Sequence, residues 1–269
     1  MTTSSPLKTT EEPFEAVSPE GSNISGRLFV PAGQPPFPAV VLLLGFGGSY
    51  RGGMYRPILE RLAQAGIVGV GFDYPEDGRD GDFVNLTFTL LASAAQATID
   101  SIGQRPLVDK GRIGLCGHSM GGIVAVEVAS RREDVKALAI VSTAWDPRAE
   151  LAALWGTTRQ RWQEEGFIDL SELDANWGMA GKRKVAYHFY ESFCAYDASE
   201  LVPRLTQPTI VIYGEKDRVV LPDKPQRYFA HLTTEKRLAG IPDADHLFTD
   251  RLALERATQA IESWFKEKL

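Results

Sequence analysis

Short apolar runs alternate along this chain with stretches in which apolar residues recur every three or four positions. The first pattern is typical of buried strands, and the second of helices that cover a sheet. Strands are expected over residues 14–18, 24–30, 38–44, 67–73, 111–116, 135–141, 209–213 and 234–238. Helices are expected over residues 54–65, 86–102, 122–129, 225–230 and 247–268. The alternation predicts a mostly parallel sheet of about eight strands with helices on both of its faces.

The first two expected strands differ from the others because only a short Pro-Glu-Gly-Ser turn separates them. A connection of that length joins antiparallel neighbours, so the sheet is expected to begin with a hairpin. Residues 1–12 are mostly polar and are expected to form a loose tail before this hairpin.

Residues 145–200 interrupt the alternation, since they are too many for an ordinary connection between two strands. They hold ten of the chain's 26 aromatic residues (13 Phe, 8 Tyr and 5 Trp), interleaved with charged residues. These aromatic side chains can form a small core of the insertion, line a substrate pocket, or do both. We therefore expect residues 1–144 and 201–269 to form an α/β core and residues 145–200 a cap. Trp145, Tyr187 and Tyr190 are candidate pocket residues of this cap.

Length and charge narrow the class of protein. A chain of 269 residues suits one large α/β domain with an insertion. The net charge of −6, without any basic stripe, argues against a nucleic-acid partner. Two cysteines do not make a disulfide framework. The polar N-terminus lacks a signal peptide and no apolar run is long enough for a membrane span, so a cytoplasmic location is expected.

A serine between two glycines stands at the junction of an expected strand and an expected helix, in Gly117-His118-Ser119-Met120-Gly121. This arrangement is the nucleophile elbow, in which a tight turn pushes the serine hydroxyl out above the sheet. Glycine at the flanking positions avoids collisions between the turn and its neighbours. Ser119 is the candidate nucleophile.

A serine hydroxyl needs a base that accepts its proton, and the base needs an acid that orients it. The useful loops of a parallel sheet follow the carboxyl ends of its strands. Of the four histidines, only His246 lies in such a loop, between the last strand and the last helix. His118 is interpreted as structural or pocket-lining, His188 belongs to the insertion, and His231 is expected to face solvent.

Asp217 is the candidate acid because it follows the expected strand 209–213 after a Gly-Glu-Lys turn. Glu215 is an alternative in the same turn. Asp243 and Asp245 compete with Asp217 because they are close in sequence to His246. The order Ser119, Asp217, His246 along the chain is the order found with nucleophile elbows in α/β folds.

The attack of the serine on a carbonyl creates an oxyanion that needs preorganised hydrogen-bond donors. One candidate donor is the backbone amide of Met120, which follows the nucleophile. The second is the backbone amide of Phe46, in the glycine-rich loop after strand 38–44. Gly45 and Gly47 flank Phe46 and allow this backbone to approach a substrate closely.

Neither metal-binding spacings of the His-Glu-x-x-His or Cys-x-x-Cys kind nor a dinucleotide fingerprint occurs. We therefore expect no metal and no cofactor. The expected partner is a small-molecule ester. An exposed aromatic face on the insertion would also suit a homodimer.

Over nearly its full length the chain resembles an α/β-hydrolase. The residues that carry the resemblance are Leu44-Gly45-Phe46-Gly47-Gly48, Gly117-His118-Ser119-Met120-Gly121-Gly122, Gly214-Glu215-Lys216-Asp217 and Ala244-Asp245-His246-Leu247-Phe248. Within that fold the chain is similar to small cytoplasmic carboxylesterases, which include cinnamoyl and feruloyl esterases. It also resembles acylglycerol lipases and dienelactone-hydrolase-like proteins, although Ser119 departs from the cysteine nucleophile of the latter. The resemblance makes Phe248 a further pocket candidate.

The expected activity is that of a serine esterase acting on short or aromatic acyl groups through an acyl-enzyme. The same triad also cleaves amides and thioesters, so an amidase, a peptidase and a thioesterase are alternatives. A ligand receptor that keeps the triad but turns over slowly is an alternative outside enzymology.

Overall fold

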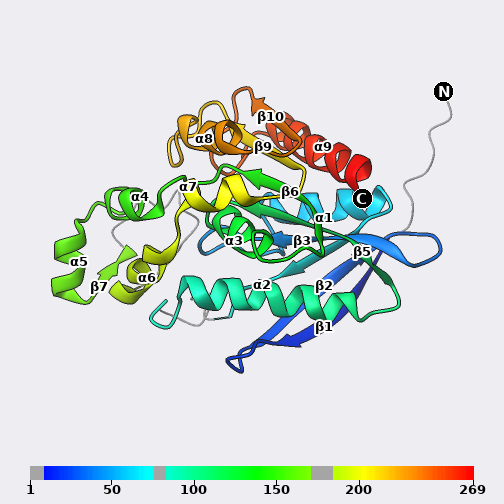
Figure 1. The fold of residues 1–269 in the computed structure, drawn as a ribbon, viewed down its shortest axis with the longest axis horizontal. Coiled ribbons are helices and arrows are strands. Elements are labelled where there is room, and N and C mark those ends of the chain that lie inside the picture. The colour runs from blue at the N-terminus through cyan, green and yellow to red at the C-terminus, as the bar shows by residue number, and fades with distance from the viewer. Residues whose placement is uncertain (1–8, 76–82, 171–183) are drawn as a thin grey trace.

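In the computed structural model, which describes residues 9–75, 83–170 and 184–269, an eight-stranded sheet runs through the molecule (Figure 1). The strands are β1 (Thr10–Val17), β2 (Asn23–Val30), β3 (Phe37–Leu43), β4 (Val68–Phe72), β5 (Val108–His118), β6 (Val135–Val141), β9 (Thr209–Gly214) and β10 (Lys236–Ile241). Their spatial order is β1-β2-β4-β3-β5-β6-β9-β10. Strand β2 pairs antiparallel with both β1 and β4, and all other pairs are parallel. The predicted fold class is therefore confirmed.

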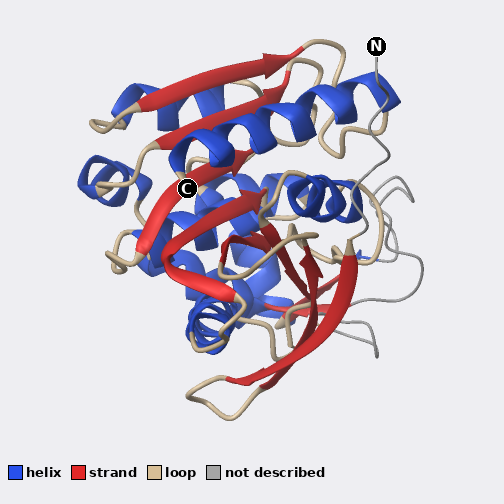
Figure 2. Ribbon diagram, turned by 90° about the vertical axis from the view of Figure 1, so that its right-hand side faces the viewer, coloured by secondary structure: helices blue, strands red, loops and turns tan. Residues whose placement is uncertain are grey.

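Helices cover both faces of this twisted sheet, as Figure 2 shows. They are α1 (Tyr55–Gln64), α2 (Phe88–Gly103), α3 (Met120–Ala129), α8 (Asp223–His231) and α9 (Arg251–Lys268). Helix α1 packs beside α9, and α2 packs beside α3. At the centre, strands β3 and β6 and residues 113–118 of β5 are almost completely buried because helices cover them on both sides. None of the helices within the described residues is both long and apolar enough to cross a membrane.

Among the element boundaries that differ from the sequence-based prediction, three have a cause in strand pairing or helix capping. Strand β1 already begins at Thr10, because residues 10–12 of the expected tail pair with β2. Strand β10 is shifted to Lys236–Ile241, where it pairs in register with β9. Helix α9 begins at Arg251, since the Asp250 carboxylate accepts hydrogen bonds from the amides of Leu252 and Ala253 and so caps the helix there.

The described residues between β6 and β9 form short elements, most of which lie beyond the end of the sheet (Figure 1). They are α4 (Pro147–Leu154), α5 (Arg159–Glu165), β7 (Phe167–Asp169), β8 (Lys184–Ala186), α6 (Tyr187–Ser192), η3 (Phe193–Ala195) and α7 (Ala198–Leu201), with η4 (Val202–Arg204) leading back to β9. Strands β7 and β8 pair antiparallel. Trp162 is fully buried among these elements, and its indole donates a hydrogen bond to the carbonyl of Val185. The fourth tryptophan of this segment, Trp177, lies outside the described residues.

The register of the parallel strands aligns their carboxyl ends. Leu43 of β3 pairs with Gly117 of β5, and His118 pairs with Val141 of β6. Val141 forms the last residue pair of the β6–β9 ladder, opposite Ile212. The loops that follow β3, β5, β6 and β9 therefore leave the sheet side by side, at one edge of the fold.

Candidate active site

Ser119 stands at the junction between β5 and α3 with φ of 53° and ψ of −121°, a strained conformation for a residue other than glycine. The neighbouring backbone explains the two flanking glycines. A Cβ atom on Gly121 would lie 2.1 Å from the carbonyl oxygen of Leu43, and one on Gly117 would lie 2.3 Å from the carbonyl oxygen of Gly121. Only glycine permits this close approach, and the resulting turn lifts the Ser119 side chain above the sheet.

The structure brings the three candidate triad residues together from three loops. The Oγ of Ser119 lies 3.1 Å from Nε2 of His246, and Nδ1 of His246 lies 2.8 Å from Oδ2 of Asp217. With its proton on Nδ1, the imidazole donates to the carboxylate and accepts a hydrogen bond from the Ser119 hydroxyl. This is the arrangement that lets an imidazole take up the serine proton.

Asp217 is buried, and its other oxygen, Oδ1, accepts hydrogen bonds of 2.9 Å from the amides of Val219 and Val220. These bonds hold the carboxylate in place beside His246. The alternative acids are engaged elsewhere: Asp243 pairs with Lys216, Asp245 accepts from Thr249, and Glu215 is exposed.

The backbone amide of Met120 begins α3 directly after Ser119, and the amide of Phe46 lies in the loop after β3. In the part of the chain that the structure describes, neither amide donates to another protein group. Phe46 and Met120 both line a cavity at Ser119. Both residues therefore lie at the cavity beside Ser119, and their amides have no protein acceptor among the described residues.

His118 and Tyr55, a residue that the sequence did not single out, connect three loops around Ser119. The Tyr55 hydroxyl accepts a hydrogen bond from the Gly45 amide and donates one to Nδ1 of His118, both at 2.9 Å. Nε2 of His118 donates to the backbone carbonyl of His246, also at 2.9 Å. Burial lowers the pKa of His118 to about 3, with a smaller contribution from the neighbouring His246. The imidazole of His118 is therefore neutral.

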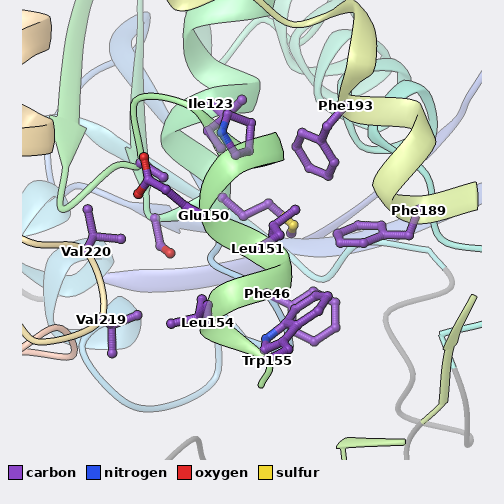
Figure 3. A pocket seen from close by; sticks show the side chains of 14 residues that line it. Phe46, Ile123, Glu150, Leu151, Leu154, Trp155, Phe189, Phe193, Val219 and Val220 are labelled. Atoms are coloured by element: carbon purple, nitrogen blue, oxygen red, sulfur yellow. The ribbon is translucent and has the colours of Figure 1, made fainter. Parts of the chain in front are cut away.

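Two spaces meet at Ser119. The inner pocket is a cavity of about 60 Å³ under α4 and α6, and its walls are apolar except for Ser119 and Glu150. Figure 3 shows Phe189 and Phe193 on one side of it, and Val219, Val220 and Glu150 on the other. The outer groove is an open space of about 650 Å³ that His246 lines. Gly45, Phe46, His118, Lys216 and Arg218 also line this groove.

The predicted pocket residues are placed in different surroundings. Gly47 and Phe248 line a cavity next to the outer groove. Tyr187 and Tyr190 stack on each other beside Trp162, and Trp145 packs against Tyr228 and His231. None of these three aromatic residues lines the described cavities at Ser119.

Other residues of the insertion line the inner pocket instead: Glu150, Leu151, Leu154, Trp155, Phe189 and Phe193. The spacing of these residues is the only feature of the sequence that could have identified them as pocket residues. Leu151 and Trp155 are four residues apart, as are Phe189 and Phe193, and such pairs share one face of a helix. Within the described residues, no group of three or more His, Cys, Asp or Glu side chains is placed to hold a metal ion.

The comparisons with known proteins agree with this geometry at the level of the family. The model of the alpha/beta hydrolase family matches residues 40–260. The esterase EstD of Thermotoga maritima is 24% identical over 257 residues, which cover 88% of this chain and 60% of EstD. The polyketide synthase ThaQ of Burkholderia thailandensis is 26% identical over 235 residues, which cover 78% of this chain but 11% of the synthase. The chain thus spans less than two thirds of the length of both relatives.

A solved structure of Est1E from Butyrivibrio proteoclasticus, described as bound to ferulic acid, superposes with a TM-score of 0.82 at 21% sequence identity. The superposition covers 95% of this chain and 98% of that one. Likeness at this level of identity establishes the shared fold.

Proposed function

Because the chain belongs to the alpha/beta hydrolase family, we propose that it is a serine hydrolase that cleaves carboxylic esters through an acyl-enzyme. The observation that carries this proposal is the continuous hydrogen-bonded row from Ser119 through His246 to Asp217. The esterase name of the relative EstD supports it.

In the proposed reaction, the Ser119 oxygen attacks the ester carbonyl while Nε2 of His246 takes the hydroxyl proton. Asp217 stabilises the imidazolium that forms. The amides of Met120 and Phe46 donate to the oxyanion of the tetrahedral intermediate. His246 then protonates the departing alcohol, which leaves the acyl group on Ser119. A water molecule, deprotonated by His246, attacks the acyl-enzyme and releases the acid and the free serine.

The inner pocket and the outer groove would hold different parts of the substrate. The departing alcohol must lie within hydrogen-bond reach of His246, and His246 lines the outer groove but not the inner pocket. The alcohol therefore belongs in the outer groove and the acyl group in the inner pocket. The inner pocket is small, with about 60 Å³ open to the centre of a water-sized sphere. This size favours a short acyl chain over an aromatic one.

We also propose that residues 1–144 and 201–269 form the catalytic core and residues 145–200 a cap over the acyl site. Trp155, Phe189 and Phe193 of this segment line the inner pocket opposite Ser119. Phe46 of the core packs against Phe189 and Trp155, with ring centroids 5.6 and 5.0 Å apart. The cap thereby closes the apolar side of the site.

Hydrolysis of p-nitrophenyl acetate, butyrate and octanoate by wild type and Ser119→Ala tests the proposal. We expect turnover of the two short esters, weak turnover of the octanoate, and a loss of about 10⁴- to 10⁶-fold in kcat for the variant. Equal turnover by both proteins would contradict the proposal. Feruloyl esters and p-nitroanilides belong in the same panel, since a preference for them would indicate an aromatic acyl group or an amide substrate.

A further inference from the structure

Among the described residues, Glu150 is the one charged side chain that lines the inner pocket, and the proposed mechanism does not use it. Its half-buried side chain shares the pocket wall with the apolar residues Pro147, Leu151 and Val220. The charges of Lys224, Asp146 and Asp223 also act on its carboxyl group. Burial raises the pKa of Glu150 above its usual value. A carboxyl group in such a position costs free energy unless something accepts or donates a hydrogen bond there.

The protein itself uses only one oxygen of this carboxyl group. Oε1 of Glu150 accepts a hydrogen bond of 3.1 Å from the amide of Asp146 at the start of α4. Within the described chain, Oε2 has no hydrogen-bond or ion-pair partner. Glu150 therefore helps to cap α4, and it keeps a second acceptor oxygen beside the acyl site.

A free acceptor in an apolar pocket selects for a donor on the ligand. A hydroxyl group has one donor and needs one acceptor, which Oε2 supplies. An ammonium group has three donors, and the apolar remainder of the wall supplies no acceptors for the other two. A hydroxyl also accepts hydrogen bonds, and Trp155 on the same pocket has a buried indole N–H without a partner among the described residues.

We propose that Glu150 determines acyl specificity, and that the preferred substrates are esters of short hydroxy acids whose hydroxyl group donates to the Glu150 carboxyl group. This inference rests on the proposed ester hydrolysis at Ser119 and names the substrate class of that site. The hydroxyl group lies at the end of the acyl chain, because the ester carbonyl is held at Ser119 and Glu150 belongs to the pocket wall contributed by α4.

The test compares methyl esters in which a terminal hydroxyl replaces a methyl group of nearly the same size. The pairs are 3-hydroxypropionate with butyrate, 4-hydroxybutyrate with valerate, and 5-hydroxyvalerate with hexanoate, and acid release gives kcat/KM. In the wild type we expect one pair, the one whose length fits, to favour the hydroxy acid by about tenfold or more. In Glu150→Leu that preference should reverse, with a higher kcat/KM for the alkyl ester.

Two further variants separate recognition from capping. Glu150→Gln keeps one acceptor oxygen for the Asp146 amide and places an NH2 group at the position of Oε2, where it can donate to the oxygen of the ligand hydroxyl group. This variant should therefore retain a preference of about threefold or more for the hydroxy acid. Asp146→Ala removes the Asp146 bonds to the amides of Arg148 and Ala149 and leaves Glu150 in place. It should slow both esters of a pair equally and keep their ratio.

The inference is overturned if no pair shows a preference in the wild type, or if Glu150→Leu lowers both esters by the same factor. The second result would leave Glu150 as a cap of α4 only. Either result can occur while Ser119→Ala still abolishes hydrolysis of the alkyl esters, so the failure of this inference is distinguishable from the failure of the proposed function.

Discussion

The Tyr55→Phe substitution removes a single hydroxyl group that joins the loop after β3 to the nucleophile turn. This hydroxyl accepts from the Gly45 amide and donates to His118, and all three groups are buried. Gly45 directly precedes Phe46, whose amide is the proposed oxyanion donor. The substitution therefore tests whether these hydrogen bonds hold that donor in place.

The expected cost follows from the groups that lose their partner. The Gly45 amide and Nδ1 of His118 would both remain buried without a hydrogen bond, at about 1–3 kcal/mol each. The free energy of unfolding should fall by about 2–6 kcal/mol. The loss in activity is bounded by the value of one oxyanion donor, about 10²- to 10³-fold in kcat. Because Tyr55→Phe displaces the Phe46 amide without removing it, we expect a decrease of about ten- to a hundredfold in kcat and little change in KM.

Tyr74→Phe is the matched control. Tyr74 is buried to a similar degree, but its hydroxyl has no hydrogen-bond partner among the described residues. Removing it should leave kcat unchanged and should not lower the free energy of unfolding. Urea unfolding and steady-state hydrolysis of p-nitrophenyl butyrate are measured for both variants. If Tyr55→Phe has the stability and kcat of Tyr74→Phe, the hydrogen bonds of Tyr55 do not position the active site.

Three further predictions concern the same region. Asp217→Asn should lower kcat by about 10⁴-fold at nearly unchanged melting temperature, and wild-type kcat in that variant would remove Asp217 from the triad. Gly121→Ala should lower the free energy of unfolding by about 3 kcal/mol or more, because its Cβ would lie 2.1 Å from the Leu43 carbonyl oxygen. In the control Gly52→Ala the Cβ meets nothing within 4 Å, so the free energy of unfolding should change by less than about 0.5 kcal/mol. Urea unfolding measures both variants. The pKa of His118 is about 3 in the folded protein and 6.5 in the unfolded chain. Between these pH values only the unfolded chain binds a proton at this residue, so the free energy of unfolding falls by about 1.4 kcal/mol for each unit by which the pH decreases. In His118→Gln the free energy of unfolding should lose this one-proton dependence on pH, which is measured between pH 6 and pH 4. An unchanged pH dependence would assign the acid sensitivity to other groups.

The central strands could be predicted closely, because burial on both faces leaves a continuous apolar run. Strand β6 occupies the predicted residues 135–141. The edge strand β10 could not be placed as well, because most of its residues are at least partly exposed and its apolar pattern is weak. Its position is set by pairing with β9. The start of α9 was misplaced for a local reason, since a cap at Asp250 ends the preceding loop.

The residues of the proposed triad could be located from sequence because each follows a strand, and parallel strands bring their carboxyl ends together. The cap is different. Tyr187 and Tyr190 are three residues apart, and Phe189 and Phe193 are four apart, so both pairs form a stripe on a helix. Only the packing decides that the first pair stacks beside Trp162 and that the second lines the inner pocket. Tyr55 and Glu150 carry no motif at all, and tertiary contacts alone reveal them.

The protonation state of His118 connects these contacts to the chemistry next to it. As a neutral ring with its proton on Nε2, His118 donates to the His246 carbonyl and accepts from Tyr55, and every donor in the row from Gly45 onward has an acceptor. A protonated His118 would donate at both nitrogens, and the Tyr55 hydroxyl hydrogen would then lose its acceptor. It would also place a second positive charge beside the imidazolium that His246 becomes in the proposed reaction, with ring centroids 4.9 Å apart. Burial of His118 therefore keeps the hydrogen bonds of three loops matched and leaves Asp217 free to stabilise a single cation.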